Sequence, residues 1–325
     1  MVAFIIRRIL QALVVMFVIS VIGFAIKHNV GDPVRQITGI SVSEAEREAL
    51  RDELGLNDPV PVQFGRFLKN AVQGDLGTSF FYKKPATSVI LSKAPATIEL
   101  VLVSAFIVIS LSVPLGIFAA IRPKHVFSKI VMGASIVGVS IPVFLTAIMG
   151  IYLFSVQLGW LPSFGRGATV DLGGWQTGFL TLDGWLHLLL PSISLSSIML
   201  PLFIRLIRSE MMEVLETEYI KYSWAKGLRK YRIWFLHAFK NTLLPVITVG
   251  GVQLGITIAF TILTETVFQW QGLGFLFMEA VERSDTSLLV AYLMFVGLVM
   301  VVVNTVVDII YGMVNPTVRI TGTAK

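Results

Sequence analysis

The sequence predicts an all-α integral membrane protein, and three observations support that fold class. Only 14% of the 325 residues are charged and 55% are hydrophobic, whereas soluble domains have roughly 25% charged residues. The mean hydropathy is +0.79. Six apolar stretches are long enough to cross a bilayer as helices, which takes about 20 residues. These six predicted spans are residues 9–26, 97–121, 130–156, 185–207, 243–268 and 288–312.

Composition and motifs exclude several functional classes. The formal net charge is +6, but basic residues of a membrane protein gather on its cytoplasmic loops, so this charge does not indicate a nucleic-acid partner. Cysteine is absent, which excludes disulfides and thiolate metal sites. No Walker loop, Gly-x-Ser-x-Gly or His-Glu-x-x-His pattern occurs. We therefore expect no catalytic residue, metal ligand or cofactor on this chain.

Residues 1–30 contain the N-terminal end and the first span. Two basic residues, Arg7 and Arg8, precede the apolar stretch. A cleaved signal peptide is the alternative interpretation, but it requires small residues at a cleavage site after the apolar stretch. Here Lys27, His28 and Asn29 follow instead. The sequence therefore favours an anchor that stays in the membrane.

The Lys and Arg residues of the short loops predict the orientation. Segments 122–129 and 208–240 are rich in these residues, while segments 157–184 and 269–287 carry one each. Because cytoplasmic loops hold the excess of Lys and Arg, the first two segments are expected in the cytoplasm. With six spans, both termini then lie there, including a tail of residues 313–325. The basic residues of the longer segment are Arg208, Lys221, Lys226, Arg229, Lys230, Arg232 and Lys240.

Residues 31–96 are too polar to cross the membrane and form an expected extracytoplasmic insertion. Ser43 and Glu46 have the spacing of a capping box and predict the start of a helix within residues 41–56. Apolar residues at helical spacing predict a second helix, with Gly74 as its terminator. We therefore predict a small helical insertion between the first two spans.

Residues 97–312 form the predicted transmembrane core of five helices. Proline inside a membrane helix removes one backbone hydrogen bond and bends the helix, and the predicted spans include Pro142, Pro191, Pro201 and Pro245. Polar residues and bends could face a central pathway, or could serve helix packing alone. The candidate pathway residues are Ser140, Pro142, Ser194, Gln253 and Thr257.

Three carboxylates lie within or beside the predicted spans. Glu99, Glu265 and Asp308 each fall near a predicted helix end. An intramembrane carboxylate is a functional hypothesis by default, but positions near the interface favour capping or ion pairing. A proton-coupled carrier needs a carboxylate or histidine near the bilayer midplane, and none is clear. This pattern disfavours a secondary carrier that works alone.

The cytoplasmic loop 208–242 contains EYIKYSWAKGL, residues 218–228. Thr217 is a suitable N-cap and Gly227 a suitable C-cap, which predicts a helix of about nine residues. So short a helix is not stable alone in water and must rest on its own protein or on a partner. Aromatic residues are typical anchors at interfaces. A docking helix and a helix lying on lipid headgroups both remain open from this pattern.

A resemblance favours the docking interpretation. The segment EYIKYSWAKGL, followed by HAFKNTLLPVIT, resembles the cytoplasmic "EAA" loop of ABC importer permeases, specifically the first (B-type) permease of the peptide/nickel family. In the same order along the chain, GDLGTSF, PATIEL, SIPVF, ILTETVFQWQGLG and VDIIYGMVNPTVR also resemble that family. The resemblance covers nearly the whole chain and implies the type I ABC importer permease fold.

The resemblance also implies partners and a docking site. The partners are a second, C-type permease, two ATPase subunits that bind ATP and Mg²⁺, and an extracytoplasmic solute-binding protein. All would act at a bacterial inner membrane, in contact with its lipid. Departures from the family at Tyr222 and Trp224 suggest a fit to one particular ATPase, and Gln271 stands where the family usually has proline. The residues that the resemblance places in the docking helix are Glu218, Tyr219, Tyr222, Ser223, Trp224, Ala225, Lys226, Gly227 and Arg229.

The sequence therefore favours an importer permease rather than an enzyme. The resemblance implies a small solute as cargo, and a dipeptide or oligopeptide is the expected one. Nickel chelates, glutathione and opines are the alternatives. A stand-alone secondary carrier or channel is the alternative function, and it would need no docking loop.

Overall fold

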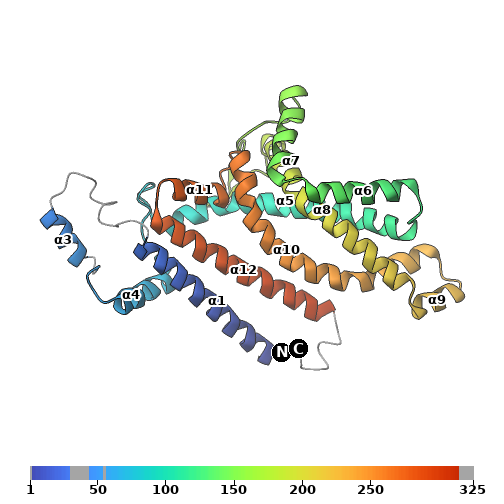
Figure 1. The fold of residues 1–325 in the computed structure, drawn as a ribbon, viewed down its shortest axis with the longest axis horizontal. Helices are drawn as coiled ribbons and strands as arrows, with labels where there is room; N and C mark the ends of the chain where they lie inside the picture. Colours follow the sequence, from blue (N-terminus) through green and yellow to red (C-terminus); the bar gives the residue numbers. More distant parts are fainter. Residues whose placement is uncertain (1, 30–43, 54–55, 315–325) are drawn as a thin grey trace. The chain divides into compact units, whose positions relative to one another are not determined.

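A computed structural model describes residues 2–29, 44–53 and 56–314, and this part of the chain is mainly helical (Figure 1). Two π-helices, η1 and η2, and two short strands accompany the α-helices. The elements are α1 (Val2–Asn29), α3 (Glu44–Glu53), α4 (Val60–Val72), α5 (Ala86–Ile121), α6 (Val126–Ser140), α7 (Val143–Gly150), η1 (Ile151–Gln157), β1 (Val170–Asp171), β2 (Gln176–Thr177), α8 (Leu182–Leu215), α9 (Glu218–Ala225), η2 (Arg232–Phe239), α10 (Lys240–Val267), α11 (Leu273–Glu282) and α12 (Thr286–Val314).

Five helices of the described part are long and apolar enough to cross a membrane. These five match the first, second, fourth, fifth and sixth predicted spans. The third prediction, a single helix over 130–156, is wrong in one respect. The helix is broken between α6 and α7, and its two parts meet at an angle of 106°. The five unbroken spans are Arg8–His28, Ala86–Ile121, Leu182–Leu215, Arg232–Val267 and Thr286–Ile310.

The break in the third span follows from Pro142. Proline disfavours the helical conformation of the residue before it, and Ile141 is extended, with φ −88° and ψ 122°. Pro142 itself then serves as the N-cap of α7. The prolines within α8 and α10 lie inside continuous helices. Of the four prolines named as predicted bends, only Pro142 lies at a break between two helices.

The insertion after α1 contains the two predicted helices. Ser43, the predicted cap of α3, lies outside the described residues, whereas Gly74 is described and has φ +82°. Two hydrogen bonds close the end of α4, from Gly74 N to Ala71 O at 3.0 Å and from Asp75 N to Asn70 O at 2.9 Å. This pair of bonds is the glycine-dependent helix ending that the sequence predicted. The predicted boundary at residues 96/97 falls inside α5, which runs unbroken from Ala86.

The chain divides into two compact units. The first comprises residues 1–96, 172–176 and 271–302, and the second comprises residues 97–171, 177–270 and 303–325. Within the first unit, Phe24, Phe64 and Phe67 form an aromatic cluster with ring centroids 5.3–6.5 Å apart. Such clusters join apolar burial to favourable edge-to-face contacts.

The second unit is built around α8, which packs against α6, α7 and α10. Residues on most sides of α8 are buried, as expected for a helix in the middle of a bundle. A small residue lets α5 approach α8 closely. A Cβ added at Gly116 would lie 2.8 Å from Ile207 Cβ and 3.1 Å from Ile204 O, so glycine is required there for this helix spacing.

Candidate functional site

The predicted docking helix is present as α9, which begins after Thr217 and ends at Ala225. Its eight residues make a helix about 12 Å long. Thr217 occupies the N-cap position with extended backbone, as predicted, but its side chain does not cap the helix. Thr217 Oγ1 donates instead to Val214 O at 2.6 Å. The N-terminal end of α9 is thereby tied to the end of α8.

Gly227 ends the helix in the way its sequence position predicted. Its φ is +74°, a conformation that side-chain-bearing residues adopt at a cost. Gly227 N donates to Trp224 O at 2.9 Å, and Leu228 N donates to Ser223 O at 3.4 Å. A Cβ added at Gly227 would meet no atom within 4 Å. Glycine is therefore favoured here by backbone conformation and not by crowding.

The inner face of α9 packs on the body of its own protein. Ile220 is fully buried, and Ser223, three residues later on the same face, is 8% exposed. Ser223 Oγ donates to Tyr219 O at 2.8 Å. Ser223 therefore lies on the inner face, and its prediction as a docking residue does not agree with this placement. The residues packed with Ile220 form the Ile220 cluster, which comprises Ile117, Ala120, Ile207, Met211, Ile233 and Ala238.

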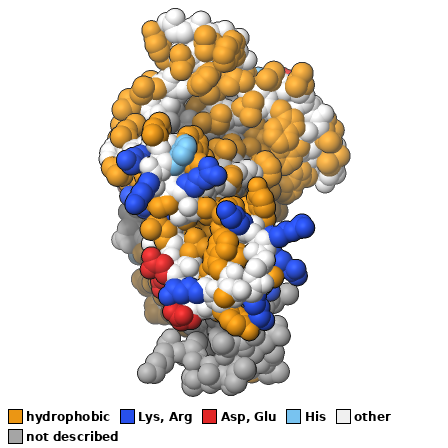
Figure 2. Space-filling view, turned by 90° about the vertical axis from the view of Figure 1, so that its right-hand side faces the viewer, with side chains coloured by type: hydrophobic (Ala, Val, Ile, Leu, Met, Phe, Trp, Pro, Cys, Tyr) orange, Lys and Arg blue, Asp and Glu red, His pale blue; other side chains and the backbone are white. Residues whose placement is uncertain are grey.

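The outer face of α9 exposes aromatic side chains. Tyr219 and Trp224 are each 41% exposed, and Tyr222 is 61% exposed. Asn241 donates to the Tyr219 hydroxyl at 2.6 Å, which fixes that ring against the start of α10. Figure 2 shows this end of the molecule, where Lys and Arg side chains surround hydrophobic ones. The other predicted docking residues are also exposed, namely Glu218, Ala225, Lys226, Gly227 and Arg229.

Charged groups on α9 interact with their neighbours. Lys226 Nζ lies 4.6 Å from the centre of the Tyr222 ring, a cation–π contact. Lys221 Nζ donates to Glu218 Oε1 at 2.7 Å. This hydrogen bond, together with the negative charge of Glu218, raises the pKa of Lys221. Lys221 therefore stays charged at neutral pH, so the outer face is both aromatic and cationic.

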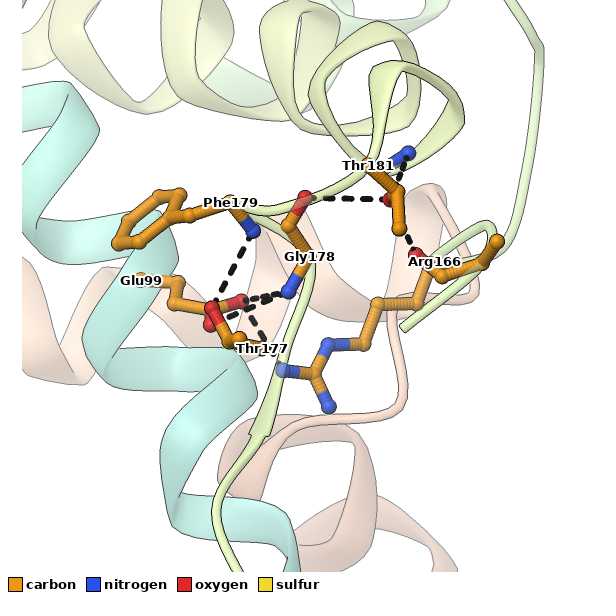
Figure 3. Close-up of polar contacts among 8 residues, drawn as sticks. Glu99, Arg166, Thr177, Gly178, Phe179 and Thr181 are labelled. Carbon is orange, nitrogen blue, oxygen red and sulfur yellow. Dashed lines mark hydrogen bonds and ion pairs between the residues drawn. The ribbon is translucent and has the colours of Figure 1, made fainter. Parts of the chain in front are cut away.

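A second polar site lies elsewhere in the same unit, around Glu99 near the start of the second predicted span (Figure 3). Glu99 is 1% exposed and accepts a hydrogen bond from Arg166 Nη2 at 2.9 Å. Both Glu99 oxygens also accept from Gly178 N at 3.3 Å. The sequence favoured pairing for Glu99, and that interpretation is confirmed. Its partner Arg166 was not predicted, although it is the one basic residue of segment 157–184.

The loop that carries Arg166 is held by further contacts. Thr181 Oγ1 donates to Ala168 O at 2.6 Å and accepts from Gly184 N at 3.0 Å, which caps α8 (Figure 3). The Arg166 guanidinium also lies 5.9 Å from the ring centre of Trp270, which is 1% exposed. The loop thus contacts α5 through Glu99 and the segment that follows α10 through Trp270.

The other two carboxylates differ in their surroundings. Glu265 is fully buried and accepts from Thr97 Oγ1 at 2.6 Å, so it is also a partnered group near a helix end. Asp308 is half-buried on α12. Among the described residues, no group of three or more His, Asp or Glu side chains could hold a metal ion. Glu265 therefore links α10 to α5 through Thr97, whereas Glu99 links α5 to the loop that carries Arg166.

Of the candidate pathway residues, Gln253 and Thr257 lie one turn apart on α10 and share a hydrogen bond, while the others lie at the break of the third span and in α8. Ser140 and Pro142 are exposed and flank the break of the third span. Thr257 is 4% exposed, and its Oγ1 lies 3.2 Å from Met199 Sδ and 2.9 Å from Gln253 O. Ser194 is buried in α8. Thr257 and Ser194 thus have packing positions, and the pathway assignment stays a prediction.

Comparison with known proteins decides the family. Residues 112–320 match the family described as "binding-protein-dependent transport system inner membrane component". Residues 1–101 match the N-terminal family of such membrane components. The chain belongs to this family. The predicted importer permease is therefore confirmed, and the membrane location with several spans agrees with it.

Curated relatives match this permease over nearly its whole length. The dipeptide transport system permease protein DppB of Alkalihalophilus pseudofirmus is 35% identical over 98% of this chain and 100% of its own. The oligopeptide transport system permease protein AppB of Bacillus subtilis is 36% identical, with the same coverage. The glutathione transport system permease protein GsiC of Escherichia coli is 32% identical over 98% of this chain and 99% of its own. These relatives are transport permeases and not enzymes.

Solved structures show the same fold as this permease. A chain of the MetNI methionine ABC transporter, in an inward-facing conformation, matches with a TM-score of 0.56 at 16% identity. The match covers 70% of this permease and 96% of that chain. The all-helical importer-permease fold predicted from the sequence is confirmed.

Proposed function

We propose that this permease forms, with a second C-type permease, the pathway by which an ATP-driven importer carries dipeptides or oligopeptides. The relatives named above are described as permeases for dipeptides, oligopeptides and glutathione, which are all short peptides. In this proposal a solute-binding protein delivers the peptide outside the cell. Two ATPase subunits bind ATP and Mg²⁺ and supply the energy.

The placement of α9 is the observation that supports this proposal most directly. Its inner face packs in the Ile220 cluster, whose members come from α5, α8 and η2. Its outer face presents Tyr219, Tyr222 and Trp224. An ATPase that binds the outer face can therefore displace α9 as a unit, and the packed inner face passes this displacement to the spans. Switching between packed arrangements is an established route for such movements.

Co-purification from the native membrane in mild detergent tests the assembly. We expect this permease to bring with it two ATPase subunits and a second permease, and the purified assembly to hydrolyse ATP. A Tyr222→Ala/Trp224→Ala variant lacks two exposed aromatic side chains of the proposed interface, so it should co-purify with less ATPase. The control is Phe164→Ala, which removes an exposed aromatic side chain from another loop and should co-purify with the normal amount. A permease that is recovered alone, with normal peptide uptake in the same cells, would contradict the proposal.

The orientation is proposed from the distribution of basic residues, with both termini in the cytoplasm. Asp75 and Arg229 are both exposed, and the chain has no native cysteine. We expect a cysteine in Asp75→Cys to react with a membrane-impermeant maleimide in intact cells. The cysteine in Arg229→Cys should react only after the cells are lysed, because α9 then faces the cytoplasm. The opposite labelling pattern would reverse the proposed topology.

A further inference from the structure

The turn between α5 and α6 carries a patch of basic residues that the proposed function does not use. It includes Arg122, Lys124 and Lys129, which are all exposed. Within the described part of the chain, no ion pair joins any of these three to a carboxylate. Figure 2 shows Lys, Arg and His side chains beside hydrophobic ones on this face of the molecule.

We infer the position of this turn relative to the bilayer from the length and apolar composition of the two helices that it joins. The span of α5 ends at Ile121, and the next apolar helix begins at Val126. Four residues separate the two, which leaves no room for the turn to extend far from the membrane surface. The first residues of α6 are strongly exposed apolar groups, with Val126 at 68%, Phe127 at 44% and Ile130 at 61%. Cations at such a boundary lie at the level of the lipid headgroups.

The turn is held in one shape by contacts around Phe118. The centroid of the Phe118 ring lies 5.9 Å from the Arg122 guanidinium carbon. It lies 5.5 Å from the centroid of the His125 ring and 5.4 Å from that of the Phe127 ring. Ser128, which is 1% exposed, donates its hydroxyl proton to Arg122 O at 2.7 Å. The cations therefore project from a packed turn, and little ordering is needed when an anion binds.

We propose that this turn, residues 122–130, binds the phosphate of an anionic phospholipid such as phosphatidylglycerol. The three cations contact the headgroup, and Val126, Phe127 and Ile130 contact the start of the acyl chains. The site lies next to the residues on which α9 packs, because Ile117 and Ala120 near the end of α5 belong to the Ile220 cluster. A bound lipid would thus stabilise the end of α5 against which α9 packs.

The test measures phosphatidylglycerol retained by the detergent-purified permease assembly, by native mass spectrometry against a phosphatidylcholine background. Each cation near an anionic surface contributes about a five-fold factor in binding. We expect Arg122→Gln/Lys124→Gln/Lys129→Gln to lower phosphatidylglycerol affinity by about a hundred-fold. The matched control Lys230→Gln/Arg232→Gln/Lys240→Gln removes the same charge from exposed positions after α9 that are outside the proposed docking surface, and it should leave the phosphatidylglycerol affinity nearly unchanged.

Two further measurements separate the site from its alternatives. Phe127→Ser should weaken lipid retention, and millimolar inorganic phosphate should not displace the lipid, because the acyl chains contribute. Thermal unfolding of each variant verifies that the fold is intact. Equal losses in the two triple variants would indicate diffuse attraction and overturn the site. Displacement of the lipid by inorganic phosphate would identify a free-phosphate site. A triple variant of the turn that retains phosphatidylglycerol but no longer co-purifies with the ATPase would identify a protein contact. Either result would overturn the proposal.

Discussion

Replacing Gly227 by proline is expected to abolish peptide uptake while the permease stays in the membrane. Proline fixes φ near −65°, whereas Gly227 has φ +74°. The substitution also removes the N–H group that donates to Trp224 O at 2.9 Å. The end of α9 must therefore rearrange, and its outer face loses the position proposed for ATPase docking. Uptake of a labelled dipeptide, with an immunoblot of the membrane fraction, measures both parts of the result.

Two matched variants at the same position separate backbone conformation from bulk. Asparagine tolerates positive φ better than other residues with side chains, and a Cβ at Gly227 meets nothing within 4 Å. Gly227→Asn should therefore keep most of the uptake. Gly227→Val, with a β-branched side chain, should lose more of it, because a left-handed conformation costs about 1–2 kcal/mol for ordinary residues. Normal uptake by the proline variant would refute the coupling role of α9.

Removing one partner of the Glu99–Arg166 pair is expected to destabilise the permease by about 3–5 kcal/mol. Glu99 and Arg166 are 1% and 11% exposed at the side chain, so Glu99→Ala leaves a guanidinium in a poorly solvated place. Arg166→Ala leaves a buried carboxylate with Gly178 N as its remaining donor among the bonds described above. Thermal unfolding of the purified variants in one detergent measures the loss.

The double variant and an exposed pair provide the controls. Glu99→Ala/Arg166→Ala should be less destabilised than the sum of the two single variants, because neither charge is then left unpaired. Arg66→Ala breaks an ion pair with Asp58 in which both side chains are at least 40% exposed. That change should cost below about 1 kcal/mol. Additive losses for the Glu99 and Arg166 variants would show that the two charges do not stabilise one another.

Local features of this fold could be predicted from the sequence. Apolar length determines where a helix can span a bilayer, so five spans were located without knowledge of their neighbours. The helix ends at Gly74 and Gly227 were also predictable, because a positive φ after a helix is a local requirement that glycine meets best. The break at Pro142 was not predicted as a break, since α8 shows that membrane helices also continue through proline.

Long-range features could not be predicted in the same way. Glu99 and Arg166 are 67 residues apart in the sequence, and only the packing of the helices brings them together. Ser223 was assigned to the docking surface, but the helical spacing from Ile220 turns it inwards once the body of the protein is in place. The proposed pathway also needs a second permease, whose contacts cannot be derived from this chain alone. The residues that face a partner therefore cannot be predicted from this sequence alone.

Helix α8 connects the α9 segment that ends at Gly227 with the loop that carries Arg166. It runs from Leu182, next to the Thr181 cap of the Arg166 loop, to Leu215, just before α9. Its 34 residues make a continuous rod about 50 Å long. A tilt of about 5° about one end of a rod of that length moves the other end by roughly 4 Å. In the proposed importer, a small angular change of α8 at its α9 end would therefore become a displacement of atomic size at its Leu182 end.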